Sequence, residues 1–135
     1  MPLIQWDDSL KVNVMIFDQQ HQKLVGMINE LYDAMKEGRS KEVLGKILDG
    51  LVDYTITHFT MEEKVMEQHK YPAYTKQKRE HENLTTSVRI LQEKFKGGKT
   101  SVSIDTLSFL KSWLTDHIKG SDKAYGPYLN SKGVR

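Results

Sequence analysis

Apolar residues recur at alternating spacings of three and four along most of this chain, which is the period of an amphipathic helix. Turn signals separate four such segments: Gly38 with Ser40, then Pro72, then the stretch "KGGK". The fourth segment loosens at Gly120. We therefore predict four helices, near residues 18–37, 41–68, 73–96 and 103–119.

The residues before the first helix follow a different pattern. The stretch "MPLIQWDDSLKVNVMIF" has short apolar pieces without a helical period. We expect an ordered, extended N-terminal arm that Trp6, Val12 and Val14 anchor on the core. Four helices with short connections favour an all-α, antiparallel up-down-up-down four-helix bundle. The 135 residues then form one domain, with the arm at 1–16, the bundle at 17–119 and a C-terminal segment at 120–135.

Several polar residues lie on the apolar stripes, at positions that should face the core. They are His21, His58, Glu62, Gln77, His81 and His117. A bundle interior accepts such groups when they are hydrogen-bonded or bind a metal. A single histidine on an apolar face is more often a satisfied core residue, but four of the five histidines here are placed this way. His58 and Glu62 are four residues apart, which stacks them on one helix face. The combination favours a shared metal site over a metal-free polar core.

Composition limits the metal chemistry. The chain has no cysteine, which excludes an iron–sulfur cluster, a thiolate zinc site and a disulfide scaffold. Imidazole with carboxylate suits iron, zinc, copper or manganese. Four imidazoles with two carboxylates suit a carboxylate-bridged metal pair better than one catalytic zinc. His69 lies roughly 16 Å along the helix from His58, too far to share these metals. We expect Glu63 and Asp116, about 100° round the helix from the stripes, to lie outside the site or in solvent.

Charge and hydropathy point to no further partner. The net charge of +2 comes from interspersed Lys, Arg, Asp and Glu, so nothing in it indicates nucleic acid or a membrane surface. No apolar run approaches a membrane span, and the first residues do not resemble a signal peptide. We expect a cytoplasmic monomer.

Four stretches resemble the signature of the hemerythrins, above all the single-domain bacterial hemerythrins: "DQQH", "HFTMEE", "YPAYTKQKREH" and "WLTDHIKGSDKAY". The similarity runs from Trp6 to about Tyr128, with the same motif order and spacing. Members of that family bind O2 reversibly at a non-haem di-iron centre. The resemblance therefore implies two iron ions as the cofactor, O2 as the partner, and carriage, storage or delivery of O2 as the function.

The resemblance also implies roles for individual residues. One iron would be held by His21 and His58, and the other by His81, His117 and position 77. Glu62 and Asp122 would bridge the irons together with a solvent-derived oxo or hydroxo group. Asp122 lies five residues after His117 and needs a distorted last turn, which the glycine of "KGSD" makes feasible. An O2 pocket on the two-histidine iron would be walled by Phe59, Trp113, Leu114 and Ile118, although ordinary core packing explains these residues equally well.

Position 77 departs from the family, which has a histidine there. Gln77 offers only a neutral carbonyl oxygen, a weaker donor than imidazole. Three alternatives stay open: weak ligation, replacement by water, or a hydrogen bond alone. We expect weaker or uneven iron loading and a short-lived O2 adduct.

Other functions also stay open at this point. They are a di-iron oxidase or peroxidase-like activity, an O2- or redox-sensing module, and a metal-free bundle. The chain contains no Glu-x-x-His, the pair that ferritin-like di-iron enzymes use. Descent from those enzymes is therefore disfavoured.

Overall fold

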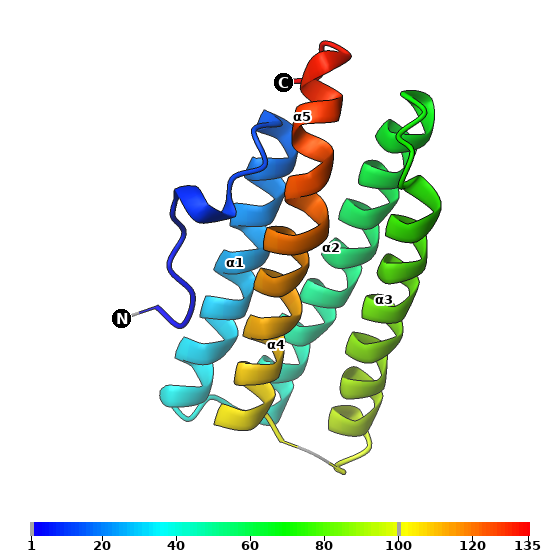
Figure 1. Ribbon diagram of the computed structural model, residues 1–135. Helices are drawn as coiled ribbons and strands as arrows, with labels where there is room; N and C mark the ends of the chain where they lie inside the picture. The colour runs from blue at the N-terminus through cyan, green and yellow to red at the C-terminus, as the bar shows by residue number, and fades with distance from the viewer. Residues whose placement is uncertain (1, 100) are drawn as a thin grey trace.

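The computed structural model is a bundle of long antiparallel helices that describes residues 2–99 and 101–135 (Figure 1). The four bundle helices are α1 (Met15–Lys36), α2 (Lys41–Gln68), α3 (Tyr74–Lys96) and α4 (Ile104–His117). The chain runs up and down in turn, and α1 also packs against α4, so the helices enclose one core. Each helix begins and ends within three residues of its predicted bounds. The all-α bundle is confirmed.

Local signals in the sequence set the helix ends. Ser40 caps α2 by accepting a hydrogen bond from the backbone N–H of Val43 at 3.2 Å, as a serine before the first helical residue commonly does. Gly38 and Gly98 follow α1 and α3 with positive φ of 69° and 73°, a conformation in which glycine is favoured at helix ends. The turns therefore lie where the sequence predicted them.

Residues 2–14 form the expected ordered arm, which is two residues shorter at its end than predicted because α1 begins at Met15. One 3₁₀ turn, η1 (Asp8–Leu10), interrupts its otherwise non-helical course. Val12 and Val14 are buried, and Trp6 is half-buried against the core. The three predicted anchors therefore all contribute to holding the arm on the bundle.

Two polar side chains of α1 fasten the backbone of the arm. Asn29 accepts a hydrogen bond from the N–H of Ile4 and donates one to its carbonyl oxygen, both at 2.8 Å. Asp18 accepts the N–H of Val12 at 2.7 Å and that of Asn13 at 3.2 Å. Backbone groups that carry no regular secondary structure need such partners when they pack on a core. These bonds explain why the arm is ordered without being helical.

The C-terminal end differs from the prediction. The last helix does not stop near residue 119 but passes through a π-helical turn, η2 (Ile118–Asp122), into α5 (Lys123–Ser131). Pro127 lies inside α5 and cannot donate a backbone hydrogen bond. Tyr125 and Leu129 nevertheless lie fully buried. The burial of these side chains outweighs the lost hydrogen bond. Glycine and proline signals in the sequence do not reveal this burial.

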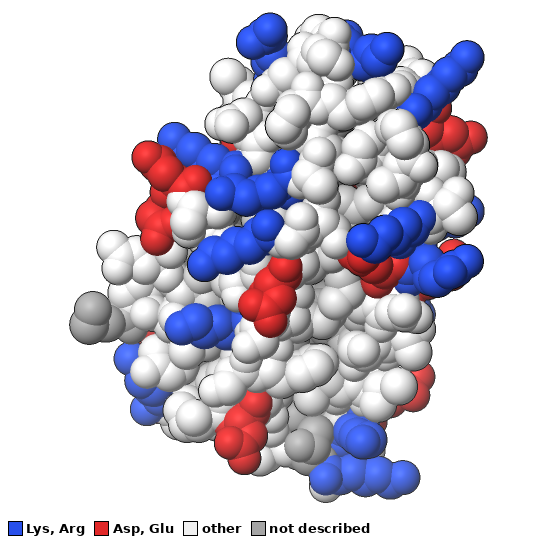
Figure 2. All heavy atoms as spheres, viewed as in Figure 1, with Lys and Arg blue, Asp and Glu red and all other residues white. Residues whose placement is uncertain are grey.

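The surface carries mixed charge. On the face shown in Figure 2, lysine and arginine side chains are spread among acidic and uncharged residues. Exposed pairs such as Lys96 with Asp49, at 3.1 Å, contribute about 0–1 kcal/mol each and do not determine the fold. Across residues 2–99 and 101–135, no helix is both long and apolar enough to cross a bilayer.

Gly126 provides a test of the contact between the arm and α5. A Cβ at this position would lie 2.3 Å from the carbonyl oxygen of Val12, a backbone atom that cannot rotate away. We expect Gly126→Ala to lower the free energy of unfolding by about 1–3 kcal/mol. The control is Gly26→Ala in the middle of α1, where an added Cβ meets nothing within 4 Å; it should raise that free energy by about 0.5–1 kcal/mol. Denaturant titrations measure both. Equal effects would contradict the described packing.

Candidate metal centre

Four imidazoles and two carboxylates meet inside the bundle. They come from every bundle helix and from the π turn: His21 (α1), His58 and Glu62 (α2), His81 (α3), His117 (α4) and Asp122 (η2). Each of these residues is at most 9% exposed, and Gln77 of α3 lies beside them at 2%. The structure thus brings together all the residues that the sequence assigned to one site.

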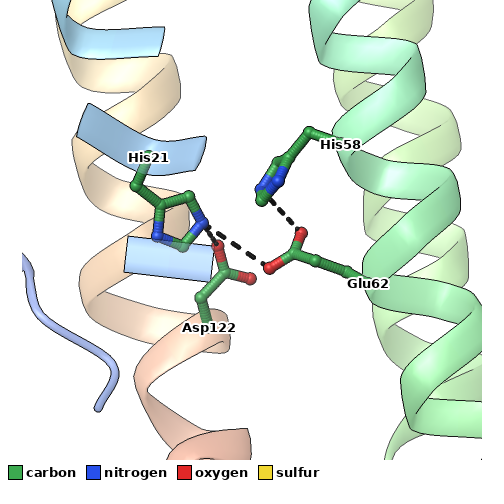
Figure 3. Close-up of side chains that lie close together, drawn as sticks. All are labelled: His21, His58, Glu62 and Asp122. Atoms are coloured by element: carbon green, nitrogen blue, oxygen red, sulfur yellow. Dashed lines mark ion pairs between the residues drawn. The ribbon is translucent and has the colours of Figure 1, made fainter. Parts of the chain in front are cut away.

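The first group consists of His21, His58, Glu62 and Asp122 (Figure 3). Nε2 of His58 lies 3.0 Å from Oε1 of Glu62. Nε2 of His21 lies 3.1 Å from Oδ2 of Asp122 and 3.5 Å from Oε2 of Glu62. One donor atom from each residue lies within 4.8 Å of all the others, which is close enough for one metal ion to contact all four.

The second group consists of His81, His117 and Asp122, again within 4.8 Å of one another. Nε2 of His117 lies 3.1 Å from Oδ1 of Asp122. Nε2 of His81 lies 3.4 Å from Oε1 of Glu62. Both carboxylates therefore contact both pairs of histidines, as bridging groups between two metals must.

The π turn places Asp122 in the site. In an α-helix a residue five positions further along lies about 140° away round the axis, on another face. In η2 the backbone N–H of Lys123 instead bonds to the carbonyl of Ile118, the wider i→i+5 pattern of a π-helix. This widening turns the carboxylate of Asp122 toward Nε2 of His117. The distorted last turn expected from "KGSD" is present.

Residues outside the site contact Nδ1 of three histidines, through hydrogen bonds at His58 and His81 and through an ion-pair contact at His117. Nδ1 of His58 lies 2.5 Å from Oε1 of Gln20, Nδ1 of His81 lies 2.9 Å from Oε2 of Glu63, and Nδ1 of His117 lies 3.4 Å from Oε2 of Glu80. An acceptor at Nδ1 keeps the proton there and leaves the lone pair of Nε2 for a metal. Glu63 thus contacts the site from outside, one of the two positions expected for it, whereas Asp116 is exposed.

Hydrogen bonding shows whether these residues fit a metal. Within the described residues, Nε2 of all four histidines, Oε1 of Glu62 and Oδ2 of Asp122 are buried without a hydrogen-bond partner, as are Nδ1 of His21 and Oε1 of Gln77. The short distances from Nε2 to the carboxylate oxygens are ion-pair contacts and are not aligned as hydrogen bonds. Buried polar atoms without partners are costly and rare. A pair of metal ions would supply a partner for the four Nε2 atoms and for the two carboxylate oxygens, so these side chains fit such a pair.

Without a metal, charge within the site is balanced by protons on imidazole. Burial lowers the pKa of His21, but Asp122 and Glu62 outweigh this and raise it to about 10. Burial raises the pKa of Glu62, yet the imidazoles of His58, His21 and His81 hold it well below its usual range. Metal binding must displace the proton on His21, since only neutral imidazole is a ligand. A metal ion and the proton on His21 therefore compete for the same imidazole.

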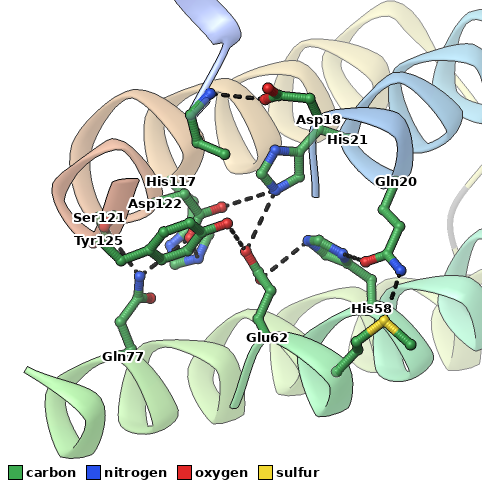
Figure 4. A network of polar contacts seen from close by, with 12 residues as sticks. Asp18, Gln20, His21, His58, Glu62, Gln77, His117, Ser121, Asp122 and Tyr125 are labelled. Carbon is green, nitrogen blue, oxygen red and sulfur yellow. Dashed lines mark hydrogen bonds and ion pairs between the residues drawn. The ribbon is translucent and has the colours of Figure 1, made fainter. Parts of the chain in front are cut away.

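Tyr125 belongs to the site, although the sequence reading did not assign it. Its hydroxyl donates a hydrogen bond to Oε2 of Glu62 at 2.5 Å, and its ring is fully buried (Figure 4). Burial and the neighbouring carboxylates of Glu62 and Asp122 raise the pKa of this phenol well above its ordinary value. Tyr125 follows Asp122 by three residues on one helix face, a spacing that could have identified it.

Apolar side chains lie against one side of the histidines. The ring of Phe59 stacks on His81 with centroids 4.0 Å apart and planes 2° from parallel, and it lies 5.8 Å from the rings of His58 and His117. Trp113 lies 6.5 Å from Phe59 and donates its indole N–H to the carbonyl oxygen of Leu84 at 3.1 Å. The residues predicted to wall an O2 pocket are all buried: Phe59, Trp113, Leu114 and Ile118.

Comparison with known proteins agrees with this arrangement. Residues 13–129 match the family model described as the hemerythrin HHE cation binding domain. The chain belongs to the hemerythrin family. It is 38% identical over 132 residues to a bacteriohemerythrin of Methylococcus capsulatus, covering 97% of this chain and 100% of the other. It is 31% identical over 120 residues to a myohemerythrin of Sipunculus nudus, covering 89% of this chain and 88% of the other.

Solved hemerythrin structures share the whole fold. The crystal structure of a wild-type hemerythrin has a TM-score of 0.87 and 37% identity to this chain, covering 93% of this chain and 96% of the other. That of an L114A mutant of hemerythrin has a TM-score of 0.88, also at 37% identity. The resemblance noted from the sequence motifs is thus confirmed over nearly the full length.

Removing either shared carboxylate should dismantle the metal pair. We expect Glu62→Ala and Asp122→Ala to lose most of the bound iron, because each carboxylate contacts both pairs of histidines. Glu63→Ala should weaken metal binding about 10–100-fold through His81, and Asp116→Ala should leave it unchanged. Competition with a chelator, followed by iron analysis, ranks the variants. The same loss in all four would contradict the assignment.

The metal-free protein should become less stable as pH rises. The pKa of His21 is about 10 in the fold against an ordinary 6.5. The protonated form therefore stabilises the fold fully below about pH 6.5, and this contribution is lost between about 6.5 and 10. A shift of this size corresponds to a few kcal/mol.

Unfolding of chelator-treated protein at a series of pH values measures this dependence. His21→Gln should flatten it, whereas His69→Gln, at the end of α2 and outside the site, should keep it. An unchanged slope in His21→Gln would show that another group is responsible.

Proposed function

We propose that this hemerythrin binds O2 reversibly at a di-iron centre whose ligands are His21, His58, Glu62, His81, His117 and Asp122. The observation that carries the proposal is the set of buried imidazole nitrogens without partners, arranged in two pairs around two shared carboxylates. Imidazole and carboxylate together suit iron. Membership of the hemerythrin family supports iron and O2 over the other metals and ligands that this donor set admits.

The side chains have different roles in the proposed site. His21 and His58 would hold one iron, His81 and His117 the other, and the two carboxylates would bridge them. A bound iron pair supplies the reversible electron exchange with O2 that side chains alone cannot provide. Gln20 and Glu63 keep the imidazoles of His58 and His81 oriented through hydrogen bonds at Nδ1, and Glu80 contacts Nδ1 of His117 at 3.4 Å.

Tyr125 and the apolar wall complete the proposed site. The hydroxyl of Tyr125 holds one oxygen of Glu62 in place, which limits rotation of a bridging carboxylate. The buried side chains of Phe59, Trp113, Leu114 and Ile118 would keep water from the side of the histidines that they cover. A dry surface around bound O2 hinders protons and water from converting it to oxidised product. This exclusion is what we expect a reversible carrier to need.

We propose that the protein acts as a monomer in the cytoplasm. All the proposed ligands come from a single chain, so the site needs no second subunit to be complete. The mixed charge over the face in Figure 2 offers no single-sign surface for a charged partner.

Reversible O2 binding can be tested on iron-loaded protein reduced under argon. We expect two irons per chain and an O2-dependent absorption that disappears when O2 is removed and returns when it is readmitted. The zinc-loaded protein serves as the control and should show no O2-dependent band. One iron per chain, or an oxidation that O2 removal does not reverse, would contradict the proposal.

A further inference from the structure

Gln77 lies beside the shared carboxylate of the second group and is bonded to it. Its Nε2 donates to the backbone carbonyl of Ser121 at 3.0 Å and to Oδ1 of Asp122 at 3.2 Å (Figure 4). The side chain is 2% exposed. Gln77 thus supports the π turn at two points, the backbone carbonyl of Ser121 and the carboxylate of Asp122.

These two bonds determine which end of the amide faces Asp122. If the amide were rotated by about 180°, its Oε1 would face two acceptor oxygens, the Ser121 carbonyl and the Asp122 carboxylate. The nitrogen must therefore face them, because only the NH2 group donates. An amide NH2 group is a poor metal ligand, since its lone pair is delocalised into the carbonyl. Oε1 of Gln77 is buried without a hydrogen-bond partner, but for it to take the place of the nitrogen beside Asp122, Gln77 would have to give up both hydrogen bonds.

The remaining donors divide evenly between the two metals. One side has the imidazoles of His21 and His58, and the other has those of His81 and His117. Glu62 and Asp122 contact both sides. Each metal would therefore be held by two imidazoles and a share in two carboxylates, and neither would have a third nitrogen ligand.

We propose that Gln77 is not a metal ligand but a positioning residue for Asp122, and that the metal held by His81 and His117 keeps a coordination position for a small exogenous anion. The inference rests on the proposed di-iron centre. In such a site both metals would have a coordination position for a ligand that the protein does not supply. Water would hold the position when no stronger ligand is present.

A groove between α3 and α4 borders one of the proposed ligands of this metal. The groove has a volume of about 450 Å³ and is lined in part by His117, Ser121, Trp113 and Glu80. His117 is 9% exposed, whereas His21 in the other group is 0% exposed. We expect a ligand of two or three atoms to approach the second metal from this side. The carboxylate of Glu80 would slow the entry of an anion without changing how many bind.

Azide provides the test on oxidised, iron-loaded protein. The wild type should bind two azide ions per chain, and Gln77→His, which supplies a third imidazole, should bind one. Gln77→Leu removes the amide without adding a ligand and should still bind two. Iron is counted first in each protein. Fewer than two irons per chain in the wild type, even after loading with iron in excess, would refute the proposed di-iron function. The azide counts at full iron loading test only the inference about Gln77.

Two azide results would overturn the inference. If the wild type and Gln77→His bound the same number of azide ions, the metal held by His81 and His117 would have no position open to azide in the wild type. One azide in the wild type and two in Gln77→Leu would mean that Oε1 of Gln77 is a ligand after all.

The metal-free protein gives a second readout. The side-chain amide protons of Gln77 should exchange with solvent at least about tenfold more slowly than those of exposed Gln68, since the bond to Asp122 is buried and the bond to Ser121 is partly buried. Equal exchange rates for Gln77 and Gln68 would contradict the positioning role of Gln77.

Discussion

The burial of four imidazoles and two carboxylates in the centre of an apolar bundle is the constraint on which the rest of this structure depends. Charged groups in such a place are tolerated only when they are paired or coordinate a metal. Each of the four long helices and the π turn contributes one or two of these groups, so satisfying them also fixes how the helices lie against one another. The same side chains form the proton-balanced core of the metal-free protein and are the proposed ligands of the iron pair. Either protons on the imidazoles or bound metal ions balance the charge of the two buried carboxylates.

This constraint explains the irregular end of the last helix. Asp122 must face inward five residues after His117, and the chain achieves this with a π turn that then allows helix to continue into α5. Tyr125 on α5 bonds to Glu62, and Gly126 lets the N-terminal arm pass against the same helix. The arm thus covers the helix that holds the shared carboxylate in place. Parts of the fold that seem remote from the site support it through these contacts.

The sequence predicted the four helices, the arm and the central cluster, because all of these follow from local period and from polar residues on apolar stripes. His21, His58, Glu62, His81 and His117 were found in this way. Asp122 lay off any regular helical face, and its role came from resemblance to the hemerythrins. Two features depended on tertiary contacts: the helix beyond Pro127, which burial of Leu129 stabilises, and the bond from Tyr125 to Glu62. The direction of the Gln77 amide likewise required the position of the Ser121 carbonyl, which no local pattern encodes.

Two iron ions between Glu62 and Asp122 are the central claim, and anomalous diffraction at the iron edge from crystals of iron-loaded protein tests it most directly. We predict two iron peaks within ligand distance of both carboxylates, one beside His21 and His58 and the other beside His81 and His117, with the amide nitrogen of Gln77 still facing Asp122. A single peak, or iron located away from the two carboxylates, would contradict the claim.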